Sequence, residues 1–524
     1  MSTPPAEWTS LFDTASSAEA ERRLDALVGE VVRGFLDQRA IHPPQPPEAQ
    51  SAPFGAVAIP VSPQDPDRYL DELRERVVKH STQVSSPHFV GHMTTALPYF
   101  MRSLSRLLVA MNQNPVKVET ADAVTPLERH VLGAFHRLVY AQDDRFYARH
   151  AQAAESTLGM VASGGTVANL TALWVARNRR LGPDGDFSGV LAAGLPAALR
   201  HYGFEEAVVV GSTLMHYSLE KAADVLGIGR ANLVKVELDS RHRIRTDRLR
   251  ETLVRLRERK RCVLALVGIA GTTDSGAVDP LDEMADLARE HGIHFHVDAA
   301  WGGPTLFSER HARLLRGIER SDSATFDGHK QLYCPMGVGL ALFRDPGAAA
   351  TIEARAEYII RTNSLDLGRR ALEGSRPAMA LYLHAALHLL GRQGLGWLID
   401  EGLRKTRHFA ERIKARPEFE LLCDPQLDVL LYRYVPKPFR AGARQGALDA
   451  AQQNAIGEVN RRIQERQTRA GRSFISRTSL DPARFGTAAP IVALRAVLAN
   501  PLTTEVDLDA VLDEQAALGA AERA

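Results

Sequence analysis

Hydrophobic residues recur at helical spacing through the first part of the chain. Apolar side chains lie three and four positions apart over 24–36 and again over 69–80, as on one face of an amphipathic helix. Prolines dominate the stretch 43–53, which cannot continue a helix and predicts an extended linker. We therefore predict an N-terminal helical appendage with its linker over 1–60, and a further helical segment over 61–125.

A third helix is expected to begin at Thr125. Pro126 suits the first helical position, because the N–H that it lacks would have no partner there. Glu128 stands where its side chain could close a capping box. These signals mark the start of a larger unit, which we predict over 126–375.

Beyond about residue 156 the pattern changes to short β-branched runs that alternate with helical segments. Strands are expected at 208–210, 233–236, 263–269, 295–297 and 338–343, with helices at 246–259 and 281–290 among them. Such alternation predicts an α/β fold whose mostly parallel sheet is flanked by helices. Ligands of such sheets bind at the carboxyl ends of the strands, so the residues that follow each strand are the first candidates for a site.

Helical patterns dominate after residue 370. Strand-like runs return at 429–434 and 491–498, and a last helix is expected from Thr504. We predict that 376–524 forms a small C-terminal α/β domain.

Composition narrows the possible partners. With 524 residues the chain exceeds the size of one hydrophobic core, and its 45% hydrophobic and 24% charged residues are typical of a globular enzyme. A net charge of +1 provides no field that would attract nucleic acid or an anionic membrane. We expect a small-molecule substrate, no nucleic-acid partner and no membrane partner.

The cysteines and the N-terminus favour a cytoplasmic location. Cys262, Cys334 and Cys423 lack zinc-type spacing, so free thiols in a reducing compartment are expected. The first residues lack the basic and apolar regions of a signal peptide, and the apolar run 262–270 is too short to span a bilayer.

A loop of small residues, Ser163-Gly164-Gly165-Thr166, precedes a predicted helix that extends to about Leu181. Free backbone N–H groups at a helix start can bind a phosphate, and the helix dipole favours its negative charge. Glycine is also common at helix starts that bind nothing, and no Gly-Lys-Ser/Thr follows, so this is not a Walker loop.

The second motif is His294-Phe295-His296-Val297-Asp298, a strand that ends in an acid. The two histidines lie on one face and could suggest a metal pair, but no third ligand stands at the right spacing, so we interpret them as packing residues and expect no metal. An acid at the end of a buried strand is costly unless it meets a cation, and a protonated pyridine nitrogen is one such cation.

The third motif is Asp327-Gly328-His329-Lys330, which precedes another predicted strand. A lysine in a desolvated site loses preference for its charged form and becomes an amine usable for imine chemistry. A single lysine in a loop is more often a solvated surface residue. The order of the three motifs is what favours a catalytic lysine.

This order, together with His216 and Thr272-Thr273, resembles the group II decarboxylases that depend on pyridoxal 5′-phosphate (PLP). The resemblance covers roughly residues 85–510. It implies a fold-type-I PLP enzyme and a homodimer with active sites at the subunit interface.

The resemblance also implies a role for each matching residue. Lys330 resembles the lysine that holds PLP as a Schiff base, Asp298 the partner of the ring nitrogen, and His216 the imidazole stacked on the ring. The other cofactor-binding positions would be Gly165, Thr166, Thr273, Ala300 and His329. Tyr358 is similar to a mobile-loop tyrosine that would protonate Cα, and Arg495 to an arginine that binds substrate carboxylate.

Two positions depart from relatives. Asp327 stands near the phosphate position, where many relatives have a neutral residue, and His92 stands where animal glutamate decarboxylases have glutamine. The segments 86–98 and 327–333 resemble those of the bacterial aspartate 1-decarboxylases within this family. Together with Arg495 as a carboxylate site, this resemblance implies L-aspartate as substrate, giving β-alanine. L-Glutamate comes second, and cysteine sulfinate or an aromatic amino acid are further alternatives. A PLP-dependent aminotransferase and a non-enzymatic binding module are the alternatives of other classes.

Overall fold

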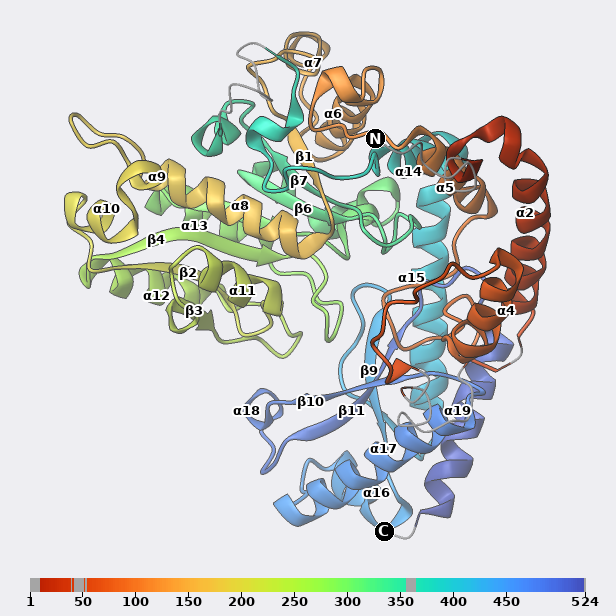
Figure 1. The fold of residues 1–524 in the computed structure, drawn as a ribbon. Coiled ribbons are helices and arrows are strands. Elements are labelled where there is room, and N and C mark those ends of the chain that lie inside the picture. Colours follow the sequence, from red (N-terminus) through yellow and green to blue (C-terminus); the bar gives the residue numbers. More distant parts are fainter. Residues whose placement is uncertain (1–9, 39, 42–50, 52–53, 355–363, 523–524) are drawn as a thin grey trace.

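Two β-sheets organise the computed structural model, which describes residues 10–38, 40–41, 51, 54–354 and 364–522. The larger sheet belongs to the yellow and green part of the ribbon, and the smaller sheet to the blue part near the C-terminus (Figure 1). None of the helices in the described part of the chain is long and apolar enough to cross a membrane. Cys262 and Cys334 are buried free thiols, as predicted, and Cys423 is half-buried.

The larger sheet has seven strands in the order β1-β7-β6-β5-β4-β2-β3. Strands β3, β2, β4, β5 and β6 run parallel, whereas β7 pairs antiparallel with both β6 and β1. The prediction of a mostly parallel sheet is confirmed. Its strands are β1 (Gly159–Ala162), β2 (Glu206–Ser212), β3 (Leu233–Val236), β4 (Arg261–Ile269), β5 (His294–Asp298), β6 (Ser323–Asp327) and β7 (Gly339–Phe343).

Helices cover both faces of this sheet, as the alternating pattern predicts. In β2, Val208 and Val210 face the core beneath α6, α12 and α13, while Ala207 and Val209 face the core beneath α8, α10 and α11. The helices of this unit are α6 (Val124–Tyr140), α7 (Asp144–His150), α8 (Gly165–Arg180), α9 (Val190–Ala193), α10 (Leu195–His201), α11 (Tyr217–Val225), α12 (Thr246–Glu258) and α13 (Leu281–His291).

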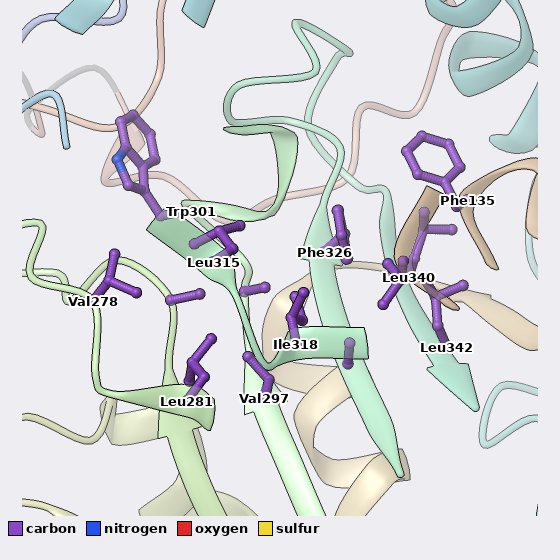
Figure 2. Packing of buried hydrophobic residues seen from close by; sticks show 14 of the residues in the cluster. Phe135, Val278, Leu281, Val297, Trp301, Leu315, Ile318, Phe326, Leu340 and Leu342 are labelled. Atoms are coloured by element: carbon purple, nitrogen blue, oxygen red, sulfur yellow. The ribbon is translucent and has the colours of Figure 1, made fainter. Parts of the chain in front are cut away.

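The first of these cores is dense around the middle strands. Figure 2 shows Val297, Phe326 and Leu340, which come from the adjacent strands β5, β6 and β7. Phe135 of α6 meets Phe326 edge-on, with ring centroids 6.0 Å apart. Aromatic pairs of this geometry contribute more stability than their buried area alone would give. The Phe135–Phe326 contact therefore helps to hold α6 on the sheet.

Glu128 corrects one expectation about α6. The helix begins at Val124 without a side-chain cap, and Glu128 forms no capping box. Instead its carboxylate is fully buried, and Oε2 accepts a hydrogen bond of 2.7 Å from Arg376 Nη1. A buried carboxylate is stable only when paired, which explains why Glu128 faces Arg376 rather than the helix start.

The N-terminal helices are α2 (Thr14–Leu36), α4 (Pro66–Arg76) and α5 (Tyr99–Met111). Helix α2 packs against α4. The helix predicted over 69–80 is confirmed, but it ends at Arg76 and a 3-10 turn follows at Val78–His80. Most of the proline-rich stretch 43–53 lies outside the described residues.

The smaller sheet is antiparallel, in the order β10-β11-β9-β8. The strands predicted at 429–434 and 491–498 are confirmed as β9 and β11, and Thr504 caps the last helix. The domain boundaries stay predictions. The elements are α14 (Ala380–Ala385), a π-helical turn (Ala386–Leu390), α15 (Gly391–Ala415), β8 (Phe419–Leu421), β9 (Val429–Tyr434), α16 (Arg440–Arg444), α17 (Ala450–Ala470), β10 (Ser476–Leu480), α18 (Pro482–Phe485), β11 (Ile491–Val497) and α19 (Glu505–Ala521).

Candidate active site

The carboxyl ends of β2, β4, β5 and β6 border a cavity of about 470 Å³. This is the edge of a parallel sheet at which ligands bind. Ten of the residues predicted for the site line the cavity: His92, Gly165, Thr166, His216, Thr273, Asp298, Ala300, His329, Lys330 and Arg495. The other one, Tyr358, lies outside the described residues.

The start of α8 forms one wall of the cavity. Gly164 lies so close to β7 that a Cβ on Gly339 would be 2.6 Å from its carbonyl carbon. The Gly165 N–H donates to Asp327 Oδ2 at 3.2 Å, and a Cβ on Gly165 would lie 3.0 Å from the same oxygen. Glycine at these positions lets the strand, the loop and the helix start meet closely, so that the start of α8 lies at the cavity wall.

Asp298 ends β5 and is 6% exposed. Its Oδ2 accepts a hydrogen bond of 2.8 Å from Asn169 Nδ2, and its Oδ1 accepts one of 3.2 Å from the Ala300 N–H. No lysine, arginine or histidine in the described part of the chain lies at ion-pair distance from it. A buried carboxylate with only neutral partners leaves room for a cationic ligand.

Asn169 was not among the site residues predicted from the sequence. It connects the Asp298 carboxylate to His296 directly and to His216 through Ser218. Its Nδ2 also donates to Ser218 Oγ at 3.0 Å, and its Oδ1 accepts from His296 Nε2 at 3.0 Å. His296 is therefore a hydrogen-bonding residue, which is more than the packing role expected for it. Burial lowers the pKa of His296 to about 4, so the ring is neutral and its Nδ1 accepts from Ser323 at 2.9 Å.

His216 is the N-cap of α11. Its Nδ1 accepts from the Ser218 N–H at 3.2 Å and lies 2.9 Å from Ser218 Oγ. Burial lowers the pKa of this imidazole, which favours the neutral ring. With Nδ1 engaged as an acceptor, the neutral ring carries its proton on Nε2 and its orientation is fixed by the start of the helix.

Lys330 follows β6 and shares its surroundings with an acid and a histidine. The Lys330 Nζ lies 3.6 Å from Asp327 Oδ2, and its side chain is 16% exposed. His329 Nδ1 lies 2.6 Å from Asp327 Oδ1 without the alignment of a hydrogen bond. The buried Asp327 thus faces the lysine, the histidine and the Gly165 N–H at once, which places it beside the start of α8.

Arg495 enters the cavity from β11 and is 8% exposed. Its Nε donates to the Thr273 carbonyl at 2.7 Å, and its Nη1 donates to Ser476 Oγ at 3.0 Å. Within the described residues no carboxylate pairs with it. Oxygen acceptors hold the guanidinium in place while its charge stays available to an anion.

His92 lies near this arginine. Its Nδ1 is 2.9 Å from Thr94 Oγ1. Burial lowers the pKa of His92, and the positive charges of Arg495, Lys330 and His329 lower it further. A neutral imidazole at the cavity wall can donate one hydrogen bond without adding charge.

Comparison with known proteins identifies the family of this chain. The pyridoxal-dependent decarboxylase conserved domain matches residues 49–435. The chain is 44% identical over 486 residues to aspartate 1-decarboxylase of Aliivibrio fischeri, over 92% of this chain and 88% of that protein. It is 32% identical over 371 residues to L-2,4-diaminobutyrate decarboxylase of Rhizobium meliloti, over 70% and 68%. The solved structure of mouse CSAD in apo form has a TM-score of 0.83 and 26% identity, over 95% of this chain and 99% of that one.

The chain belongs to the pyridoxal-dependent decarboxylases. It is an amino-acid decarboxylase, a carboxy-lyase, with the fold of the type-I PLP enzymes and PLP as its cofactor. The resemblance noted in the sequence is confirmed. The cavity fits this cofactor, since it joins a glycine-rich helix start, a buried carboxylate without a cationic partner among the described residues, and a lysine amine.

Proposed function

We propose that the enzyme removes the α-carboxylate of L-aspartate and so forms β-alanine and carbon dioxide. The observation that carries this proposal is Arg495, a buried cation at the cavity wall that has no carboxylate at ion-pair distance among the described residues. An anionic substrate group would offset the cost of burying that charge. The relative named aspartate 1-decarboxylase supports the shorter of the two acidic amino acids.

PLP, when bound, supplies the electron sink that receives the electron pair of the broken Cα–carboxylate bond. We assign Lys330 as the residue whose amine attaches the cofactor covalently. The N–H group of Thr166 and the side chain of His329 would hold the phosphate, and Gly165, whose own N–H donates to Asp327, would leave room beside it. His216 would pack against the cofactor ring, and Thr273 and Ala300, which also line the cavity, would lie beside it.

Asp298 holds a proton on the ring nitrogen in this proposal. Its carboxylate has hydrogen-bond donors on both oxygens, from Asn169 and from the Ala300 N–H, so it keeps a fixed direction. A fixed negative charge next to the nitrogen favours the protonated ring, which withdraws electrons more strongly. Tyr358 stays the predicted donor of the proton that Cα receives.

We propose that His92 helps the enzyme to discriminate between acidic substrates of different length. With Nδ1 engaged by Thr94, the neutral ring can offer Nε2–H to the side-chain carboxylate of a short acid. Because aspartate and glutamate differ by one methylene, a pocket separates them by only about 1–3 kcal/mol. We therefore expect measurable activity on glutamate as well.

The proposal is tested by measuring kcat/KM for aspartate, glutamate, cysteine sulfinate and an aromatic amino acid with one preparation. Aspartate is expected to give the highest value, with carbon dioxide released in equal amount to β-alanine. A higher value for glutamate would reverse the ranking. Activity on aromatic amino acids alone, or keto acid in place of carbon dioxide, would overturn the acidic-substrate proposal.

Replacing Arg495 by glutamine is expected to lower kcat/KM for aspartate roughly 10- to 100-fold, because a charge-assisted hydrogen bond to carboxylate is lost. The loss should appear mainly in KM. Arg477→Gln on the adjacent strand β10 is the matched control, since Arg477 is exposed and pairs with Glu465 at 2.9 Å. Equal effects of the two variants would count against Arg495 as the substrate-binding residue.

Replacing Asn169 by leucine is expected to lower kcat by about 10- to 100-fold, as for other residues that orient a reactive group from behind. The leucine side chain removes the hydrogen bond that Asn169 donates to Asp298. It also removes the one that Asn169 donates to Ser218, the residue that orients His216. Asn178→Leu is the control, because Asn178 is equally buried on α8 but bonds only the Thr351 carbonyl and its own neighbour Arg177. Both variants should lose stability, but only Asn169→Leu should lose activity beyond what the folded fraction explains.

We also propose that the enzyme is a homodimer with active sites at the subunit interface. Met336, a cavity-lining residue, is 64% exposed in one chain, and Tyr99 and Val109 of α5 are 76% and 73% exposed. Apolar side chains this exposed favour a covering partner. Sedimentation equilibrium of the PLP-loaded enzyme should give twice the mass of the chain, and a monomer with full activity would refute the proposal.

A further inference from the structure

We propose that His130, His384 and His388 form a binding site for a divalent transition metal of the zinc type, separate from the cofactor cavity. One ring nitrogen from each residue can be chosen so that all three lie within 4.8 Å of one another. None of the three residues lines the cavity described above. The site needs no second chain, because all three imidazoles belong to one copy.

The backbone that carries these imidazoles is held by the hydrophobic core. His130 lies on α6, whose neighbouring residue Val131 is fully buried, and His384 lies on α14 beside the fully buried Leu383. Helix α14 packs against α6. The two helices therefore fix the positions from which the side chains of His130 and His384 extend toward each other.

His388 belongs to the π-helical turn that follows α14. His384 and His388 are four positions apart, a spacing that places two side chains on the same face of a helix. Their ring centroids are 4.1 Å apart, and the centroid of His130 lies 6.1 Å from that of His384 and 6.4 Å from that of His388. Short π-helical turns are rare and occur often at functional sites.

The donors define the class of metal. Imidazole nitrogen suits zinc, cobalt, nickel and copper, whereas magnesium and calcium require oxygen ligands. The cluster has no carboxylate, and among the described residues none of its three rings has a hydrogen-bond partner. Zinc held at about 2.0–2.1 Å by tetrahedral nitrogen ligands keeps those nitrogens about 3.4 Å apart, so the rings need only close by side-chain rotation.

Three protein ligands leave the remaining coordination positions to water. Because His130 and His388 are exposed and His384 is half-buried, the ion can reach the cluster from solvent. A bound ion would tie α6 to the turn after α14. We therefore expect metal binding to raise the melting temperature, since a ligand that binds only the folded state stabilises it.

The test uses the full-length, PLP-loaded enzyme after removal of free cofactor, titrated with Co²⁺ and Zn²⁺ and followed by cobalt absorption and calorimetry. One ion per chain is expected, together with a rise in melting temperature. His384→Asn and His130→Asn should each weaken binding at least tenfold and abolish that rise while leaving decarboxylation unchanged. His201→Asn, at an exposed histidine paired with Asp184, should leave binding unchanged.

Three results would overturn the site. The unaltered enzyme could bind no ion, the double variant His130→Asn/His384→Asn could bind as tightly as the unaltered enzyme, or the stoichiometry could be one ion for two chains. Circular dichroism of each variant shows that it is folded, so loss of binding is assigned to the missing ligand. Decarboxylase activity is measured in parallel, which separates this test from that of the proposed substrate.

Discussion

Replacing Lys330 by alanine is expected to lower turnover at least about a thousandfold, as removal of other covalent catalytic groups does. The variant has no amine to attach the cofactor. It keeps the glycine-rich start of α8 and Asp298, so weak, non-covalent binding of PLP should remain. The measurements are carbon dioxide release and the mass of the chain after borohydride reduction, which should show no added cofactor.

One further variant separates the role of the Lys330 amine from that of its positive charge, and a control variant removes a different lysine. Lys330→Arg keeps a positive group near Asp327, which lies 3.6 Å from the native amine, but cannot form the covalent link. It should be as inactive as the alanine variant. Lys235→Ala removes an exposed lysine paired with Glu220 and should remain active. A reducible link in the alanine variant would assign the cofactor to another lysine.

The fold class could be predicted because most strands of the large sheet are apolar and β-branched. The run 263–269 is buried along its whole length in β4, as expected for a strand covered on both faces. β6 was not predicted, because Ser323, Ala324 and Asp327 have no strand preference. They form a strand because β5 and β7 pair with them on either side, a tertiary effect that local sequence does not carry.

Most of the cavity residues could be predicted because they follow a strand or begin a helix at the same edge of the large sheet, whereas Arg495 of β11 and His92 came from the family resemblance alone. Asn169 could not be predicted, since a polar residue one turn inside α8 has no local signal that separates a hydrogen-bonding role from packing. Asn169 is four residues after Gly165, a spacing that places both residues on the same face of α8. The histidine cluster was missed for another reason: His130 and His384 are far apart in sequence, and only the packing of α14 on α6 brings them together.

Replacing Asp298 by asparagine is expected to lower kcat by about 10²- to 10³-fold, because a preorganised charge at the reacting group is lost while its shape is kept. The amide introduced at this position can still accept the Asn169 hydrogen bond through its oxygen, so the fold should survive. Asp279→Asn is the control: because burial raises the pKa of Asp279 to about 7, a neutral amide changes the charge there only in part. Asp279 itself does not line the cavity, and its two carboxylate oxygens accept the backbone N–H groups of Ile244 and Ile269, so its variant should lose stability rather than rate. Cofactor occupancy is measured for both variants, so that kcat is compared per bound PLP. If kcat of Asp298→Asn falls by less than about tenfold, or ~1.4 kcal/mol, Asp298 is not the partner of the ring nitrogen.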